Sequence, residues 1–229
     1  MKTIGLIGGM SWESSLHYYR LINQGVRAAR GGIASAPLLL HSFDFAEIAA
    51  MQAAGEWGAL ADRLAAAAQG LHAAGAEAVL ICTNTMHKVA QAVDDASPAA
   101  LIHIADPLAD AVISAGHSSV GLLGTRFTMN EPFYHERLRA RGLQTVSPPV
   151  EERDELNRII FEELCAGRVN DSSRATYIDS ISRMAANGAD CVALACTEIM
   201  LLVEPDDSML PSFDTTALHA AAAVDFVLS

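Results

Sequence analysis

Two cysteines occupy similar surroundings in the two halves of this sequence. The segments G-A-E-A-V-L-I-C-T-N-T-M-H-K at 75–88 and G-A-D-C-V-A-L-A-C-T-E-I-M-L at 188–201 share a small-residue turn, an acid, an apolar run and Cys-Thr. Inversion of a stereocentre needs two acid/base groups, because one removes a proton from the carbon and the other delivers a proton to the opposite face. We therefore predict that Cys82 and Cys196 are a catalytic pair.

Cysteine chemistry also limits the classes of site. A free thiol has a pKa of about 8.5 that falls readily at a helix N-terminus, so a thiolate and a thiol can coexist near neutral pH. The four cysteines make no disulfide framework and no C-x-x-C pair, and no histidine pair has zinc-ligand spacing, so we expect no metal. We expect Cys165 and Cys191 to be small buried hydrophobic residues.

Polar residues follow each candidate catalytic cysteine. They are Thr83, Asn84 and Thr85 after Cys82, and Thr197 and Glu198 after Cys196. Backbone N–H groups and hydroxyls at helix N-termini bind carboxylates, so these turns suit an amino-acid ligand. Glu198 has two open interpretations. It meets the substrate ammonium or orients a neighbour, or it is a first-turn acid that the helix dipole favours.

The sequence argues against two common cofactors. Pyridoxal phosphate needs a Schiff-base lysine, and the chain has only Lys2 at its terminus and Lys88 within a predicted helix. Nicotinamide binding is not indicated, because G-L-I-G-G-M departs from G-x-G-x-x-G. Its Gly8-Gly9 pair either lets the backbone approach a small ligand or makes an ordinary tight turn. We expect His87 and His103 to serve the fold, and the reaction to need no cofactor.

Short apolar runs alternate with helical patterns along the chain. The expected strands are 3–7, 37–43, 78–81, 101–104, 119–123, 143–146 and 191–195, and the expected helices are 12–30, 44–52, 57–74, 86–96, 106–115, 132–141, 154–166, 172–187 and 215–228. Alternation of this kind predicts parallel sheets, which bind ligands outside the carboxyl ends of their strands. Both candidate cysteines lie at such ends.

Matching landmarks indicate an internal duplication. Gly5 matches Gly121 at nearly the spacing at which Cys82 matches Cys196. We predict an α/β protein of two similar Rossmann-like domains with parallel sheets, related by a pseudo-two-fold axis, with the active site in the cleft between them. The expected domains are 1–98 with 212–229, and 99–211. The final helix, after a loop at 205–211, is expected to fold back on the first half.

Composition limits the kinds of partner that the protein is expected to bind. The 229 residues are 51% hydrophobic and carry a formal charge of −12 with no run of Lys or Arg, so nucleic acid is not an expected partner. No apolar run approaches the roughly 18 residues of a membrane span, and the N-terminus lacks the features of a signal peptide. We expect a cytoplasmic protein that acts on a small molecule.

Four segments carry a resemblance to a known family. They are G-L-I-G-G-M-S-W-E-S at 5–14, C-T-N-T-M-H-K at 82–88, I-I-F-E-E-L-C-A-G at 159–167 and A-C-T-E-I at 195–199. With these motifs the sequence resembles the aspartate/glutamate racemase family of cofactor-independent amino-acid racemases. The resemblance implies two similar domains with a cleft between them, a homodimer, and Cys82 and Cys196 as the acid/base residues.

The resemblance also implies a set of substrate-binding positions: Met10, Gln52, Thr83, Asn84, Thr85, Thr125, Thr197 and Glu198. Met10 and Gln52 rest on the resemblance alone. Aspartate-specific relatives hold the side-chain carboxylate with an Arg and a Lys, but the corresponding segments 45–52 and 163–167 contain neither, although Arg168 is near. A buried carboxylate without a partner is costly. Glutamate, or neutral amino acids held through Gln52 and hydroxyls, therefore stays open beside aspartate.

Three alternatives remain at this stage. The chain could be an amino-acid-binding module without catalysis. It could be a relative in the same superfamily that acts on a hydantoin, maleate or an arylmalonate. It could also be a thiol redox protein, which the lack of C-x-x-C disfavours.

Overall fold

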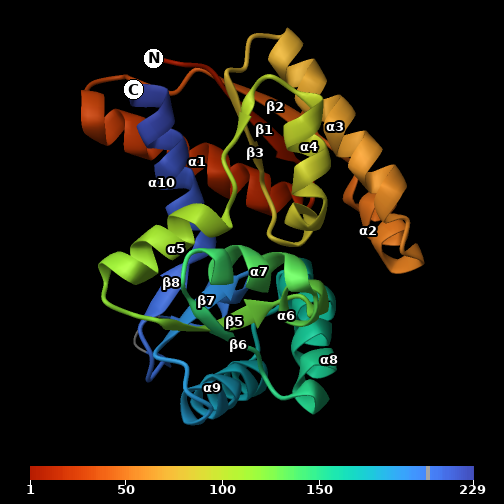
Figure 1. Ribbon diagram of the computed structural model, residues 1–229, viewed down its shortest axis with the longest axis vertical. Coiled ribbons are helices and arrows are strands. Elements are labelled where there is room, and N and C mark those ends of the chain that lie inside the picture. The colour runs from red at the N-terminus through yellow and green to blue at the C-terminus, as the bar shows by residue number, and fades with distance from the viewer. Residues whose placement is uncertain (205–206) are drawn as a thin grey trace. The chain divides into compact units, whose positions relative to one another are not determined.

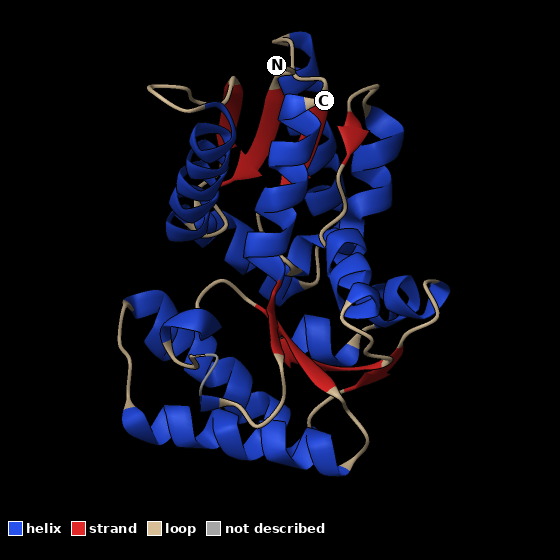
Figure 2. Ribbon diagram, turned by 90° about the vertical axis from the view of Figure 1, so that its left-hand side faces the viewer, coloured by secondary structure: helices blue, strands red, loops and turns tan. Residues whose placement is uncertain are grey.

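The protein consists of two compact units with one strand topology. The computed structural model describes residues 1–204 and 207–229, so residues 205–206 of the expected loop at 205–211 lie outside the described residues. The first unit is Met1–Ile104 with His219–Ser229, and the second is Ala105–Leu218. Each unit contains a four-stranded parallel sheet with flanking helices (Figures 1 and 2). The predicted α/β class with two parallel sheets is confirmed.

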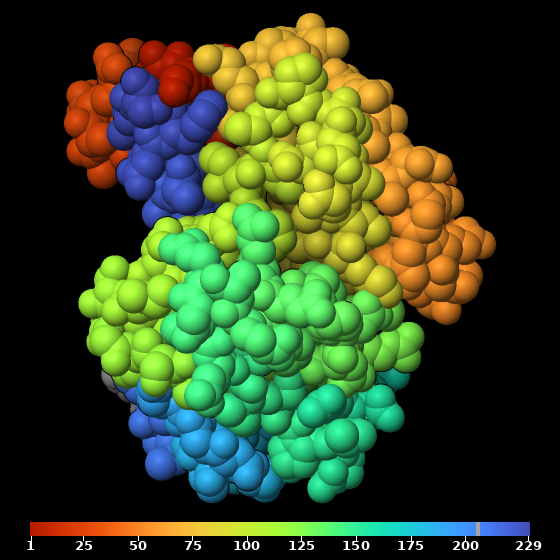
Figure 3. Space-filling view, in the orientation of Figure 1, coloured from red at the N-terminus to blue at the C-terminus, as the bar shows by residue number. Residues whose placement is uncertain are grey.

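The first unit has the strand order β2-β1-β3-β4. Its elements are β1 (Ile4–Gly8), α1 (Trp12–Arg30), β2 (Leu38–Ser42), α2 (Phe45–Ala54), α3 (Trp57–Ala73), β3 (Ala78–Ile81), the 3-10 helix η1 (Thr85–Val89), α4 (Ala90–Ala96), β4 (Ala100–Leu101) and most of α10 (Thr215–Leu228). Lys2 donates its backbone N–H to the carbonyl of Val227 over 2.9 Å. The C-terminal helix therefore returns to the first unit, as expected, and lies beside the N-terminal residues in Figure 3.

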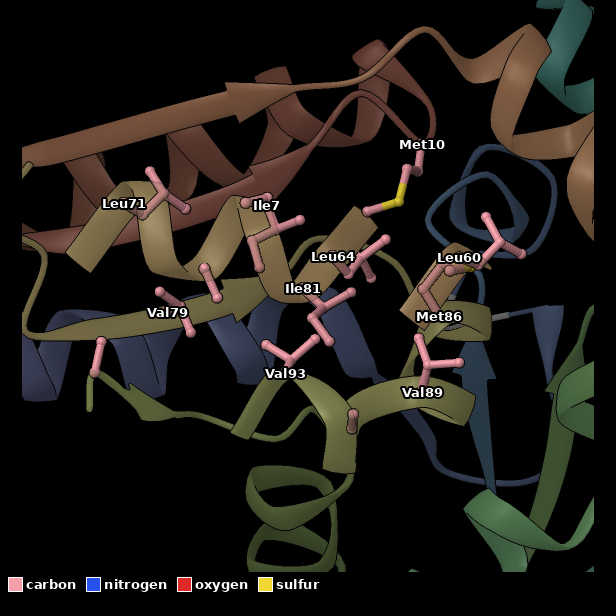
Figure 4. Packing of buried hydrophobic residues seen from close by; sticks show 14 of the residues in the cluster. Ile7, Met10, Leu60, Leu64, Leu71, Val79, Ile81, Met86, Val89 and Val93 are labelled. Carbon is pink, nitrogen blue, oxygen red and sulfur yellow. The ribbon is translucent and has the colours of Figure 1, made fainter. Parts of the chain in front are cut away.

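Alternation along β1 and β3 divides the apolar side chains of the first unit between two cores. Successive residues of a strand point to opposite faces of the sheet. Ile7, Val79 and Ile81 pack against Leu64 and Leu71 of α3 (Figure 4). On the other face, residues of β1 and β3 pack with α1 and α10, in a cluster that includes Ile4, Leu6, Leu80, Tyr18, Ile22, Ala220 and Val227.

The second unit repeats this topology as β6-β5-β7-β8. Its elements are α5 (Ala105–Ser114), β5 (Ser119–Gly124), α6 (Arg126–Asn130), α7 (Pro132–Ala140), β6 (Gln144–Val146), α8 (Val150–Arg158), the π-helical turn η2 (Ile159–Glu163), η3 (Leu164–Ala166), α9 (Asp171–Ala186), β7 (Cys191–Ala195), η4 (Ile199–Leu201) and β8 (Ser212–Asp214). Strand for strand, the order matches the first unit. This agreement supports the duplication predicted from the repeated segments.

The acid of each repeated segment joins the starts of two strands. Thr3 donates its N–H to a Glu77 carboxylate oxygen over 3.1 Å, and Ser119 does the same to Asp190 over 3.1 Å. In return, the N–H of each acid donates to the carbonyl of Thr3 or Ser119. The repeated acid therefore has a structural explanation at the end of the strand remote from the cysteine.

The unit boundaries lie later in the chain than the sequence indicated. Ala78 pairs with Ala100 across β3 and β4, so β4 belongs to the first sheet, and the first unit extends to Ile104. Leu194 pairs with Asp214 across β7 and β8, so residues 212–218 belong to the second unit. Strand β8 was not predicted, because its sequence, S-F-D, has a single apolar residue and so shows no strand pattern.

Several helices differ locally from expectation. The predicted helix 86–96 begins as the 3-10 helix η1, and the predicted helix 154–166 is α8 followed by the turns η2 and η3. Helix α6 and turn η4 were not predicted, since neither is long enough to show apolar periodicity. Among the described helices, none combines the length and the hydropathy that crossing a membrane would require.

Candidate functional site

Cys82 lies directly after β3, at the carboxyl end of the first sheet. Its N–H donates to the carbonyl of Ile7 over 2.9 Å, which continues the pairing of β3 with β1. The side chain is fully buried in the cluster between the sheet, α1 and α10, which includes Tyr18 and Ala223. Burial raises the pKa of the Cys82 thiol, because a buried thiolate loses its hydration. The Cys82 side chain is thus a neutral thiol at neutral pH.

A tight turn follows Cys82. Thr83 donates its N–H to the carbonyl of Ile81 over 2.8 Å, and Asn84 and Thr85 are buried. The helix that begins there, η1, has five residues and 3-10 geometry. Such a turn aligns few peptide dipoles. The expected lowering of the thiol pKa by a helix N-terminus is therefore not found at Cys82, where burial has the larger effect.

Met10 and Gln52 lie near this turn. The Gln52 amide nitrogen is 3.0 Å from the sulfur of Met86, the residue after Thr85. Met10 is buried in the cluster that also contains Met86, and Figure 4 shows both methionines. The first unit thus groups the predicted positions Met10, Gln52 and Thr85.

The Gly8-Gly9 pair makes a tight turn that only glycine fits. Gly9 has a φ of 79°, and a Cβ at this residue would lie 2.2 Å from the carbonyl oxygen of Phe43. A Cβ on Gly8 would lie 2.5 Å from Ser15 Oγ, which already accepts the N–H of Gly9 over 2.8 Å. Of the two interpretations left open, packing of the turn against its own chain explains both glycines.

Cys196 follows β7 at the carboxyl end of the second sheet. Its thiol donates a hydrogen bond of 3.0 Å to Glu198 Oε2, and the Thr197 hydroxyl donates to the same oxygen over 2.6 Å. Burial and the negative charge of Glu198 raise the pKa of the Cys196 thiol. The carboxylate therefore orients its neighbours, which is one of the two roles considered for it, and offers Cys196 a proton acceptor.

Thr125 lies beside this turn in the second unit. Gly124 pairs with Ala195 across β5 and β7, so the next residues, Thr125 and Cys196, leave adjacent strands together. Thr125 is buried and occupies the N-cap position of α6. The second unit thus brings Thr125, Cys196, Thr197 and Glu198 to one end of its sheet.

The two cysteines are not at equivalent positions of their sheets, contrary to expectation. Gly5 pairs with Val79 and Gly121 pairs with Val192, which aligns the two central strand pairs. Cys82 follows Val79 by three residues, whereas Cys196 follows Val192 by four. Because side chains alternate, the two thiols enter opposite faces of their own sheets. Cys82 packs toward α1 and α10, and Cys196 packs with residues of η2 and α9.

The basic residues near the predicted sites have other partners. Lys88 lies with its ammonium 3.8 Å from the centroid of the Trp57 ring. The exposed Arg168 donates a hydrogen bond to the carbonyl of Glu162. Neither contact involves the predicted substrate-binding residues.

One group in the described part of the chain has metal-ligand geometry, formed by His117, Asp190 and Cys191. The Asp190 carboxylate already accepts the N–H groups of Ser118 and Ser119 and the Ser118 hydroxyl. Cys191 begins β7, at the end of the strand remote from Cys196, and burial raises its pKa to about 12. Asp190 is therefore explained by its role in joining strands.

Sequence reasoning missed the surroundings of His87. The His219 ring from α10 lies next to it, and the Tyr18 hydroxyl from α1 is hydrogen-bonded to His219. No local signal could have found them, because they come from opposite ends of the chain. The rings of His87 and His103, which were expected to serve the fold, are in contact.

Comparisons with known proteins find similarity to racemases of one family. Residues 7–223 match the family model described as Asp/Glu/Hydantoin racemase. The structure of a candidate Asp/Glu racemase from Yersinia pestis is similar over 100% of both chains, with 48% identity and a TM-score of 0.94. An aspartate racemase homologue from Pyrococcus horikoshii OT3 also matches over 100% of both chains, with 32% identity and a TM-score of 0.86. The aspartate racemase of Picrophilus torridus shares the fold at 18% identity, over 99% of this chain and 94% of its own, with a TM-score of 0.78.

Proposed function

Because the chain belongs to the Asp/Glu/hydantoin racemase family, we propose that it racemises an amino acid without a cofactor, with Cys82 and Cys196 as the two acid/base residues. The observation that carries this proposal is the placement of the thiols. Each follows an inner strand at the carboxyl end of its sheet, where α/β proteins bind ligands. The scheme requires that both thiols reach one Cα from opposite sides. We also propose a homodimer, which rests on the resemblance alone.

In this scheme the first proton transfer runs along the hydrogen bond from Cys196 to Glu198. Glu198 takes the S–H proton, and the Cys196 thiolate then removes the proton from Cα. Cys82, which burial holds as a thiol, delivers its own proton to the opposite face. The cycle leaves Cys82 as a thiolate and Glu198 as a carboxylic acid, and a proton passed through solvent restores both. The opposite direction starts from the Cys82 thiolate.

The substrate belongs to the amino acids, with aspartate and glutamate as the first to test. The proposed contacts are Met10, Gln52, Thr83, Asn84, Thr85, Thr125, Thr197 and Glu198. None of these residues is basic, so a side-chain carboxylate would be held by hydroxyl and amide groups. Amides and hydroxyls also hold neutral side chains, which leaves a broader set of substrates within the proposal.

Incubation of single enantiomers in D₂O tests the reaction. Racemisation through a carbanion places deuterium at Cα of the inverted product. Cys82→Ser and Cys196→Ser should each abolish inversion, and Cys165→Ser provides a matched control that should not. Inversion without deuterium at Cα would exclude the mechanism. Binding of amino acids without inversion by the native protein would instead indicate a binding module.

A further inference from the structure

Three buried histidines meet at the carboxyl end of the first sheet. We name His87, His103 and His219 the histidine cluster. The ring of His87 lies 4.5 Å from that of His103 and 5.7 Å from that of His219, measured between centroids. These residues come from η1, from the segment after β4, and from α10. All three belong to the first unit.

The hydrogen bonds of His87 allow one protonation state. Its Nδ1 lies 2.9 Å from the carbonyl oxygen of Thr83, and its Nε2 lies 3.1 Å from the backbone N of Ile104. A carbonyl only accepts and a backbone N–H only donates, so Nδ1 carries the proton and Nε2 accepts. His87 is therefore the neutral imidazole with its proton on Nδ1.

His219 holds the same backbone segment from another side. Its Nε2 donates to the carbonyl of Ile102 over 2.7 Å, and the Tyr18 hydroxyl donates to its Nδ1 over 2.8 Å. The segment 102–104 is thus held by two hydrogen bonds. His219 binds the carbonyl of Ile102, and His87 accepts the N–H of Ile104. Ile104 is also the last residue before the chain passes into the second unit.

We propose that His87 is a positioning residue for the reaction, whose imidazole fixes the turn that carries Cys82 to the segment 102–104. This inference rests on the proposed function. The Thr83 carbonyl is one peptide unit beyond Cys82, so the hydrogen bond from Nδ1 limits the orientation of the backbone that aims the thiol. The single ring then links that turn to the segment that His219 also holds.

Protonation of His87 breaks the link. A proton on Nε2 would point at the N–H of Ile104. Two donors would then face each other, and the hydrogen bond between them would be lost. The groups around His87 are the rings of His103 and His219, the carbonyls of Thr83 and Asn84 and the Ile104 N–H. Burial and the neighbouring imidazoles lower the pKa of His87 well below its usual range. The link therefore persists at neutral pH and opens in acid.

Two substitutions separate the two hydrogen bonds. An asparagine nitrogen reaches the position of Nδ1, so His87→Asn keeps a donor for Thr83. A glutamine oxygen reaches the position of Nε2, so His87→Gln keeps an acceptor for Ile104 but loses the bond to Thr83. His72 lies on α3 with its Nδ1 3.2 Å from the carbonyl oxygen of Ala76, and it gives the matched control His72→Asn.

The test uses the full-length protein and three measurements. We expect His87→Gln, which loses the bond to Thr83, to lower kcat about tenfold with KM unchanged. His87→Asn, which loses only the bond to Ile104, should lower kcat less, by about threefold, and His72→Asn should leave kcat unchanged. Alkylation of Cys82 by iodoacetamide, followed by mass spectrometry, should be faster in His87→Gln than in His87→Asn. Nitrogen-15 spectra of the histidine rings of the native protein should show the Nδ1–H tautomer for His87 at pH 7.

The outcomes distinguish this inference from the proposed function. Equal kcat and equal alkylation in His87→Gln and the native protein would overturn the positioning role. An imidazolium or an Nε2–H tautomer for His87 in the native protein would overturn it as well, even if the variants failed to fold. If the native protein inverts no amino acid, the proposed function fails, while alkylation and the nitrogen-15 spectra still report on the turn.

Discussion

The Cys196 thiol and the Glu198 carboxylate share a hydrogen bond of 3.0 Å, and the Thr197 hydroxyl donates to the same carboxylate oxygen. In the first unit, the residue two positions after the cysteine is Asn84, whose amide cannot take a proton at neutral pH. The two thiols therefore have different immediate partners. A pair that shares one reaction need not share one environment, provided that each thiol can both give and accept a proton.

Replacing Glu198 by glutamine should slow the proposed reaction strongly. The amide still accepts a hydrogen bond from Cys196 but cannot take its proton, so we expect a loss of about 100-fold in kcat, typical of removing a general base. Steady-state kinetics with each enantiomer give the measurement. Glu136→Gln, at an exposed position of the same unit, is the control. Activity within about threefold of native in Glu198→Gln would remove Glu198 from the mechanism.

A side chain at Gly9 should destabilise the first unit. Gly9→Ala places a Cβ 2.2 Å from the Phe43 carbonyl at a φ of 79°, and we expect a loss of more than about 2 kcal/mol in the free energy of unfolding. Gly116→Ala has a similar φ of 82° but nothing within 4 Å of its Cβ. It should cost only about 1 kcal/mol. Urea unfolding measures both losses. Equal losses would show that the backbone conformation alone determines the change in the free energy of unfolding.

The alternation of apolar runs with helical patterns was enough to predict both parallel sheets, and the apolar runs before Cys-Thr marked the strands β3 and β7. The return of α10 was expected from its position at the end of the sequence. The repeat itself was clear because each copy needs the same acid at the strand start, Glu77 or Asp190. What the sequence did not reveal was relative register. Strand β7 has five residues and β3 has four, so apparently matching cysteines differ by one position, which reverses the face of a strand.

Contacts between distant segments could not be predicted from the sequence either. Tyr18 and His219 meet although they are 201 positions apart in the sequence, and neither lies in a motif. The thiol pKa values are raised by burial and, at Cys196, by the charge of Glu198. After Cys82 the apolar pattern predicts an ordinary helix, whereas the structure has the 3-10 helix η1. Each candidate cysteine, with the threonine after it, lies at the carboxyl end of its sheet, whereas the groups that orient these residues had to come from the structure.

Stability should fall in mild acid because of His87. Its pKa is lowered in the folded protein by burial and by His103 and His219, while the unfolded value is about 6.5. The unfolded state therefore binds the proton more readily, and the stabilisation present above about pH 6.5 is lost as pH falls, by at most about 1.4 kcal/mol per pH unit for one group. Urea unfolding between pH 7.5 and 5.5 measures it.

The contribution of His87 is separated by substitution. His87→Asn should show a weaker dependence of stability on pH than the native protein, since the titrating ring is gone. His41→Asn, at an exposed position of β2, should leave the dependence unchanged. An identical pH dependence in His87→Asn and the native protein would show that other groups control the acid response.

Single serine substitutions should separate exchange from inversion. With Cys82 replaced, Cys196 can still remove the Cα proton that faces it, and return of deuterium from the same side gives exchange without inversion for one enantiomer. With Cys196 replaced, Cys82 should exchange the other enantiomer, and more slowly, because its buried thiol is hard to ionise and Asn84 offers no proton acceptor. Proton NMR at Cα in D₂O follows both reactions. If both variants exchanged the same enantiomer, the thiols would not act on opposite faces. The double variant should exchange neither, and any exchange that remained would identify a base other than the two cysteines.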